Sequence, residues 1–249
     1  AGKFSEVLGS LAQRAGEGSN PLLVPREEVK KVHVVLCTSD RGLCGGFNAN
    51  LIDKADDFVK EKAGEGIEFS FTNFGKKGRD WCRKEKLQID TEHLGVVGGS
   101  FGFNIAMTAG KTLVDAFLEG TYDEVYLVYA QFVSMARQLP VLQQLLPIPP
   151  IVAEEAEEAD TYMPEHICEP STESLLGEML PRNVYVQIYS ALLETSTSEH
   201  AARMMAMDNA TSACNDMLEN LTLIYNKARQ AAITAELMDI VGGAEALKG

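Results

Sequence analysis

Residues 39–48 (SDRGLCGGFN) have the composition of a ligand-binding loop, because their glycines lie between an apolar run and an amphipathic one. A glycine-rich loop between a strand and a helix can present backbone N–H groups to a phosphate. Its spacing matches neither G-x-G-x-x-G nor G-x-x-x-x-G-K-S/T, and no lysine follows the glycines. The alternative is a tight turn that lets the strand and the helix pack closely, with Asp40 and Arg41 available for polar contacts. The spacing favours the turn.

The other residues with catalytic or metal-binding chemistry do not form a recognisable constellation. Four histidines, His33, His93, His166 and His200, lack the spacing of a metal site, so we expect them to be structural or exposed. No sequence signature pairs Cys44 with a base, and the five cysteines contain no C-x-x-C pair. We therefore predict no active site and no metal site. Most cysteines are expected to be buried thiols in a reducing compartment.

The composition excludes several classes of partner. The chain has 249 residues, 45% of them hydrophobic, with a net charge of −14 and a pI of about 4.7. This acidity argues against direct binding to nucleic acid and against anchoring on anionic lipid. No apolar run approaches the roughly 20 residues of a membrane span, and the first residues do not resemble a signal peptide.

Apolar patterning predicts the elements that must position these residues. Strands are predicted at 31–38, 67–74, 87–90 and 124–133, and helices at 47–62, 76–84 and 103–119. This alternation implies βαβ crossovers and a mostly parallel sheet. The order then breaks at the proline-punctuated residues 140–150, and the acidic residues 153–160 (AEEAEEAD) predict a solvated loop. From residue 171 the chain is helix-forming, with a candidate break at Pro181 and a stop at Gly242 and Gly243.

A single apolar line runs along the C-terminal region at alternating steps of three and four residues. Its members are Met207, Ala210, Cys214, Met217, Leu221, Ile224, Ala228, Ala231, Ala235 and Met238. This period is that of a coiled-coil seam. No proline or glycine interrupts residues 199–241, which would form a helix about 65 Å long, too long to fold back into a compact core.

The seam needs a partner. An intrachain hairpin is the usual solution, but no other segment carries a comparable seam, and the short predicted helix at residues 2–15 covers only a fraction of it. We therefore expect a partner outside this sequence, which could be another subunit, a second copy or a further piece of chain.

Five stretches together resemble the gamma subunit of F-type ATP synthases. They are residues 39–48 (SDRGLCGGFN), 144–147 (QLLP), 198–208 (SEHAARMMAMD), 209–211 (NAT) and 221–247 (LTLIYNKARQAAITAELMDIVGGAEAL). The resemblance extends from Gly2 to Leu247. It implies a non-catalytic rotor of the central stalk that transmits rotation of the c-ring to the alpha/beta catalytic hexamer, to drive ATP synthesis or hydrolysis.

The resemblance also implies a domain organisation. Residues 21–170 would form an α/β foot domain with a Rossmann-like, mostly parallel sheet, and residues 171–249 a long C-terminal coiled-coil helix. Residues 1–20 would be the remnant of an N-terminal helix that pairs with the C-terminal one in this family. Only residues 2–14 resemble that element, so we expect this sequence to lack most of it.

Residue-by-residue carry-over predicts two partner surfaces and no cofactor. The positions expected to contact the alpha and beta subunits are Arg203, Arg229, Gln230 and Glu236. The positions expected to face the epsilon subunit and the c-ring are Asp40, Arg41, Gly42, Tyr162 and Glu169. The family implies a peripheral location at the cytoplasmic face of the bacterial plasma (inner) membrane, without a membrane span. The cysteine-bearing regulatory insertion of chloroplast members is absent.

Two other classes of protein compete with this interpretation. A Rossmann-type nucleotide-binding enzyme with a helical dimerisation arm would need a P-loop-like or dinucleotide signature, which the sequence lacks. A self-assembling coiled-coil scaffold would bury the seam against copies of itself. Nucleotide binding by the isolated chain would favour the first, and self-association without alpha and beta subunits would favour the second.

Overall fold

The computed structural model describes residues 20–149, except residues 27, 65 and 100, and residues 172–247. The strands are β1 (Lys31–Cys37), β2 (Glu68–Phe74), β3 (Gln88–His93), β4 (Glu124–Ser134) and β5 (Arg137–Leu146). The helices are α2 (Phe47–Ala63), α3 (Lys76–Lys84), α4 (Phe103–Leu118) and α5 (Thr172–Ala246). The helix expected at residues 2–15 and the acidic residues 153–160 lie outside the described residues.

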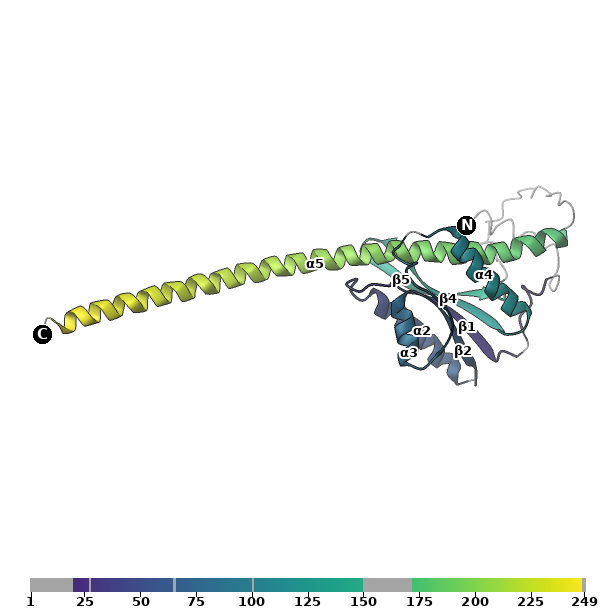
Figure 1. Ribbon diagram of the computed structural model, residues 1–249, viewed down its shortest axis with the longest axis horizontal. Coiled ribbons are helices and arrows are strands. Elements are labelled where there is room, and N and C mark those ends of the chain that lie inside the picture. Colours follow the sequence, from purple (N-terminus) through teal and green to yellow (C-terminus); the bar gives the residue numbers. More distant parts are fainter. Residues whose placement is uncertain (1–19, 27, 65, 100, 150–171, 248–249) are drawn as a thin grey trace, which may run out of the picture. The chain divides into compact units, whose positions relative to one another are not determined.

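The five strands form one sheet in the order β3-β2-β1-β4-β5 (Figure 1). The first four run parallel, because each is joined to the next by a helix, and β5 returns antiparallel to β4. Strand β1 lies between β2 and β4, with Val34 paired to Phe71 on one side and to Tyr126 on the other. Its central place explains its nearly continuous apolar sequence. The predicted mostly parallel α/β sheet is confirmed.

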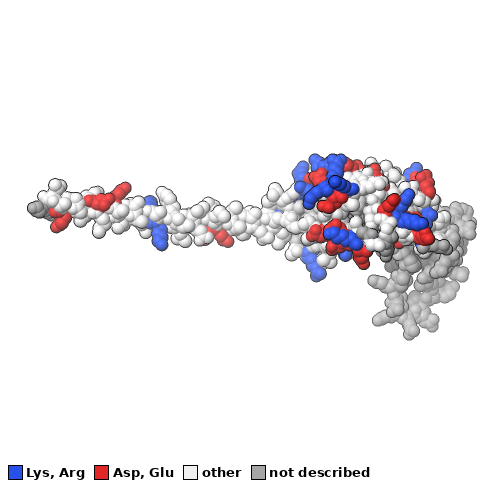
Figure 2. All heavy atoms as spheres, turned by 90° about the horizontal axis from the view of Figure 1, so that it is seen from below, with Lys and Arg blue, Asp and Glu red and all other residues white. Residues whose placement is uncertain are grey.

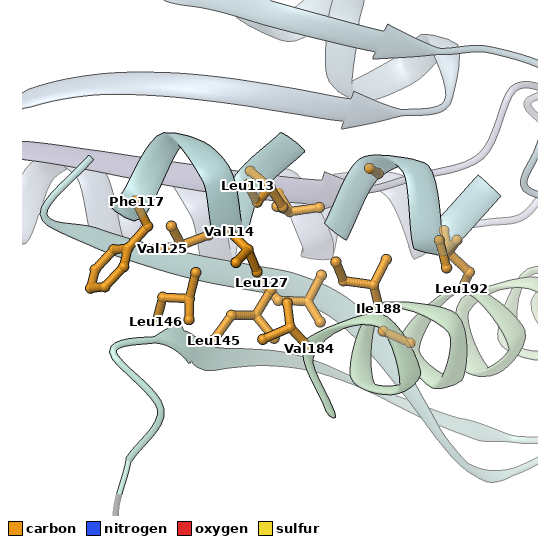
Figure 3. Close-up of a cluster of buried hydrophobic side chains, with 14 of the residues drawn as sticks. Leu113, Val114, Phe117, Val125, Leu127, Leu145, Leu146, Val184, Ile188 and Leu192 are labelled. Atoms are coloured by element: carbon orange, nitrogen blue, oxygen red, sulfur yellow. The ribbon is translucent and has the colours of Figure 1, made fainter. Parts of the chain in front are cut away.

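Helices cover both faces of the sheet and bury two apolar clusters. On one face α2 and α3 pack over side chains that include Val34 and Phe71. On the other face α4 and the first part of α5 pack over Val125 and Leu127 (Figure 3). The two helices of this second layer approach closely, since a Cβ at Gly110 would lie 2.4 Å from the ring of Tyr185.

Strand β5 corrects the expectation that the order breaks at residues 140–150. Pro140 lies inside β5, opposite Ala130 of β4. Because β5 is an edge strand, the missing N–H of proline leaves no neighbouring strand without a donor. Pro140 therefore lies in an edge strand, whereas Pro147 and Pro149 follow the end of β5 at Leu146.

Helix α5 is continuous through positions that the sequence analysis treats as a break and a stop. Pro181 lies within it, and it ends at Ala246, beyond Gly242 and Gly243. Leu180 and Val184, which flank Pro181, are completely buried, so packing offsets the local cost of the proline. The expected break and the expected stop are therefore wrong.

The described chain divides into two compact units, Ala1–Arg203 and Met204–Gly249, so the division falls within α5. The first part of α5 belongs to the α/β unit because its apolar residues recur about every four positions and are buried there. They are Leu176, Leu180, Val184, Ile188 and Leu192, of which Figure 3 labels the last three. The two compact units thus divide after Arg203.

A polar cluster lies within the sheet around His33, which is fully buried. Its Nδ1 lies 2.6 Å from Ser70 Oγ and its Nε2 lies 2.9 Å from Thr72 Oγ1. Tyr122 stacks on the imidazole at 4.3 Å and donates a hydrogen bond of 2.6 Å to Asp90. Burial lowers the pKa of His33 to about 4, although the nearby Asp90 carboxylate opposes this effect. His33 is therefore a neutral, structural group at neutral pH.

Shortening Ile188 to alanine should destabilise the α/β unit. Ile188 is fully buried between α5 and the sheet, and deletion of a buried branched side chain typically costs about 2–5 kcal/mol. The control is Leu193→Ala on the same helix, because Leu193 is 44% exposed. Denaturant unfolding followed by circular dichroism measures both variants. Equal losses of unfolding free energy in the two would contradict this account of the packing.

The stability should fall in mild acid because of His33. The unfolded histidine takes up a proton near pH 6.5, whereas the folded one resists protonation until about pH 4. Above pH 6.5 His33 therefore costs the folded protein no stability. Between pH 6.5 and pH 4 its resistance to protonation lowers the free energy of unfolding by roughly 3 kcal/mol. Unfolding of the wild type and of His33→Gln across this range gives the measurement. The wild type should show the steeper dependence on pH, and equal slopes would refute the assignment.

Candidate functional site

The glycine-rich residues 38–46, here called the β1–α2 turn, form a compact turn at the carboxyl end of β1. Asn48 of α2 holds it, since Asn48 Oδ1 accepts the N–H of Ser39 at 3.0 Å. Leu43 has a φ of 63° and Gly45 a φ of 59°, and these left-handed conformations tighten the turn. Leu43 is consequently exposed, while Cys44 is buried beneath it.

Asp40 decides between the two interpretations of this turn. Its carboxylate accepts a backbone N–H from Lys76, the first residue of α3, at 3.2 Å, and one from Gly95 at 3.0 Å. Free N–H groups at a helix start can hold a phosphate, and here the Asp40 carboxylate occupies one of them at the start of α3. Its negative charge would also repel a phosphate. The geometry therefore favours a turn that ties together the ends of β1, β2 and β3.

Helix α5 reaches the same edge of the sheet through two charged residues. Arg203 forms an ion pair of 2.6 Å with Glu199, and its guanidinium donates a hydrogen bond of 3.4 Å to the carbonyl of Gly42. Glu199 is only 1% exposed, and its carboxylate lies against Gly98 of residues 94–102, the β3–α4 loop. In open α/β sheets a ligand binds at this edge, where the strand order reverses direction. Here side chains of α5 meet the loops instead.

The role of Glu199 is not among the predictions made from the sequence. The spacing of Glu199 and Arg203 is the usable signal, because residues four apart on a helix face one another. Ala201 and Ala202, which lie between Glu199 and Arg203, are also buried, so this stretch faces protein. Asp40, Gly42 and Arg203, predicted from the resemblance, do lie around the same turn. Arg41 is exposed beside them.

The cysteines and histidines do not supply a nucleophile or a metal site in the described part of the chain. Cys37, Cys44 and Cys82 are buried, and burial raises the pKa of Cys82 to about 11, so its thiolate is disfavoured. Cys214 is exposed, contrary to the expectation for a seam residue. No group of three histidine, cysteine or acidic residues is arranged for a metal within the residues described.

A small groove lies between α5 and the sheet, with a volume of about 190 Å³. Gln143 of β5 donates a hydrogen bond of 2.9 Å to Gln187 of α5 along it. Burial raises the pKa of Tyr129, and the nearby charge of Glu194 adds to the effect. The lining consists largely of amides, hydroxyls and small side chains, which suits hydrogen bonding to a polar surface rather than acid–base catalysis.

The second compact unit is a helix with its apolar seam exposed. The larger seam side chains are Met207, Met217, Leu221, Ile224 and Met238, with exposures of 41–65%. Three threonines, Thr211, Thr222 and Thr234, return their hydroxyl hydrogen bonds to carbonyls of their own helix. Figure 2 shows charged side chains crowded over the α/β unit and sparse along this helix.

The remaining predicted contact residues fall into two groups. Arg229, Gln230 and Glu236 are exposed on the second unit. Tyr162 and Glu169 lie outside the described residues. Within the described residues, no helix combines the length and the apolar character needed to cross a membrane.

Comparison with known proteins gives a family match along almost the whole chain. The family model described as ATP synthase matches residues 1–247. The ATP synthase gamma chain of Desulfosudis oleivorans is 66% identical over 253 residues, which cover 100% of this chain and 85% of that protein. The gamma chain of Nitratidesulfovibrio vulgaris is 52% identical over 249 residues, with coverages of 100% and 85%.

Solved structures are similar in fold. A chain of the Euglena gracilis mitochondrial ATP synthase OSCP/F1/c-ring assembly has a TM-score of 0.61 and 18% identity, and the match covers 98% of this chain and 90% of that one. A chain of the Tetrahymena thermophila mitochondrial ATP synthase central stalk and c-ring has a TM-score of 0.56 and 21% identity, with coverages of 84% and 93%. The family match and the high identities to curated gamma chains show that this chain belongs to the ATP synthase gamma-chain family.

Proposed function

We propose that this chain is the rotor subunit of an F-type proton-translocating ATP synthase. It would link rotation of the c-ring to the alpha/beta catalytic hexamer, in ATP synthesis or in hydrolysis. The observation that carries the proposal is the exposed apolar seam from Met207 to Met238, on a helix that continues without a break into the α/β unit. The similar solved structures, one from a central stalk with its c-ring and one from an OSCP/F1/c-ring assembly, support it.

The mechanism requires differential contacts rather than reactive groups. A single helix has different side chains around its circumference, so inside a ring of like subunits it would touch each of them differently. Each catalytic site would then be biased towards a different conformation, and rotation would exchange these biases. Arg229, Gln230 and Glu236 are the proposed contacts with the hexamer along the exposed helix. Exposed ion pairs contribute only about 0–1 kcal/mol, which is weak enough for the contacts to be exchanged.

The proposed partners of the α/β unit are the epsilon subunit and the c-ring. Asp40, Arg41 and Gly42, in the β1–α2 turn, together with Tyr162 and Glu169, are the proposed contact residues. Arg203, which the resemblance predicts to contact the alpha and beta subunits, lies next to this turn, and we retain it as a proposed contact with the hexamer. The subunit would then be a peripheral part of the complex, at the cytoplasmic face of the bacterial inner membrane.

We further propose that the subunit has no catalytic activity of its own. Asp40, in the β1–α2 turn, already accepts the backbone N–H groups of Lys76 and Gly95 and places a negative charge at the turn, and the buried thiols are poor nucleophiles. A Rossmann-type enzyme is therefore the weaker candidate. The coiled-coil scaffold remains the alternative that the exposed seam allows, and light scattering of the chain with and without alpha and beta subunits separates it from a rotor.

The isolated chain should neither bind nor hydrolyse ATP. Isothermal titration with Mg-ATP at high protein concentration, together with a phosphate-release assay, gives the measurement. Asp40→Asn is the informative variant, because it removes the competing negative charge and keeps the shape of the side chain. Saturable binding or steady phosphate release by the pure wild-type chain would overturn the non-catalytic assignment.

Substitution of Arg229 by alanine should lower ATP hydrolysis by the reconstituted complex of this chain with alpha and beta subunits. Loss of a contact worth about 1 kcal/mol corresponds to a decrease of about fivefold in rate. Lys227→Ala is the matched control, since Lys227 is an exposed basic residue two positions away on the same helix. If both variants hydrolyse ATP at the wild-type rate, Arg229 is not a contact of the kind proposed.

A further inference from the structure

The buried face of α5 changes character within the α/β unit. From Leu176 to Leu192 this face is mainly apolar and packs into the core, with Asn183 as a buried polar exception. In the last turns before the unit ends at Arg203, the same helix buries polar groups instead. Thr195 and Ser198 are fully buried, and Glu199 is 1% exposed. We call Thr195, Ser198, Glu199 and Arg203 the polar stripe.

Two members of the polar stripe hold a single residue of β4. The backbone N–H of Ala130 donates to Thr195 Oγ1 at 3.3 Å, and Ser198 Oγ donates to the carbonyl of Ala130 at 3.2 Å. Ala130 lies opposite Pro140 of β5, and both its backbone N–H and its carbonyl are bonded to side chains of α5. The helix and the strand are thus joined by a matched pair of hydrogen bonds.

The other two members reach the loops. Arg203 bridges Glu199 and the carbonyl of Gly42 in the β1–α2 turn. Glu199 contacts the β3–α4 loop at Gly98, where a Cβ would lie 2.7 Å from Glu199 Oε2. Gly98 also has a φ of +82°, so both its backbone conformation and the nearby Glu199 carboxylate favour glycine at this position. The polar stripe therefore contacts three separate segments of the α/β unit.

Burial of Glu199 is costly, and stability alone does not explain it. Its Oε2 is buried and has no hydrogen-bond partner among the described residues. Replacing a buried ion pair by apolar residues is often neutral or stabilising, whereas such pairs can specify one arrangement over others. Apolar contacts have no preferred direction, and the neighbouring Ala201 and Ala202 are small. Hydrogen bonds weaken steeply when they are bent, so they resist rotation of the helix.

We propose that the polar stripe fixes the rotational position of α5 in the α/β unit and transmits torque between them, with Glu199 as a positioning residue that acts through Arg203. The proposal rests on the rotor function proposed above. Because the stripe is bonded to three segments, rotation of the helix in either direction strains at least one of its contacts. The stripe lies in the last turns of the unit, where a load on the exposed helix enters it.

The test compares complete ATP synthase complexes that contain wild-type, Glu199→Gln or Asp56→Asn chains. Glu199→Gln keeps the shape of the side chain and removes the charge that pairs with Arg203. Asp56→Asn breaks an exposed ion pair with Lys60, also spaced i, i+4, and is the matched control. The readouts are ATP hydrolysis, protons pumped per ATP, and angular fluctuations of the stalled rotor seen by single-molecule tracking.

Glu199→Gln should lower proton pumping per ATP by about twofold or more and widen the angular fluctuations, while hydrolysis stays near the wild-type rate. The double variant Glu199→Gln/Arg203→Gln should pump no worse than the more impaired of its two single variants, as expected for residues that act as one unit. A purely structural role would reduce the yield of complex but leave pumping per ATP unchanged in the complexes that form.

Wild-type pumping and wild-type fluctuations in the Glu199→Gln complex would overturn the inference about the polar stripe, and would leave the proposed rotor function standing. A wild-type chain that fails to support any coupled pumping with its partner subunits would overturn the proposed function instead. If Glu199→Gln complexes do not assemble, the test uses Ser198→Ala instead, which removes only the hydrogen bond from Ser198 to the carbonyl of Ala130. It should change the same readouts in the same direction, and no change would again overturn the inference.

Discussion

Burial of the first part of α5 against the sheet is the constraint on which the rest of this structure depends. Beyond Arg203 nearly every side chain is exposed, so that part of the helix gains little from tertiary packing. Its attachment comes from residues such as Leu180, Ile188 and Leu192, each of which contributes on the order of 1.5–3 kcal/mol by burial. Gly110 of α4 lets the helix approach closely enough to make these contacts.

At the carboxyl edge of the sheet, contacts within the chain occupy the place where α/β enzymes bind a ligand. In α/β enzymes the loops at this edge leave backbone donors free for a ligand. Here two carboxylates of the chain itself engage those loops, Asp40 through hydrogen bonds to Lys76 and Gly95, and Glu199 through its contact with Gly98. The loops are thereby bound to each other and to α5, which stiffens the edge where an enzyme would need it to open.

The sequence predicted most of the fold because local patterns and tertiary packing agree in its βαβ part. They disagree at prolines and glycines. Pro140 and Pro181 look like interruptions. An edge strand can accommodate Pro140, and burial of Leu180 and Val184, on either side of Pro181, offsets the free-energy cost of a proline within α5. The site was harder to predict, since burial of Glu199 depends on residues 94–102, which are about a hundred positions away. Cys214 was misjudged because a seam residue is buried only when its partner is present.

The two parts of α5 solve opposite physical problems with the same backbone. Inside the α/β unit the helix must not turn, and large apolar residues followed by directional polar contacts oppose rotation. Beyond it, small and flexible side chains such as alanine and methionine adapt to changing neighbours. Threonines that bond to their own helix keep hydroxyl groups from forming strong outside contacts. A helix that is held firmly at one end and adheres weakly along the other can carry torque, because load passes through the strong contacts while the weak ones exchange.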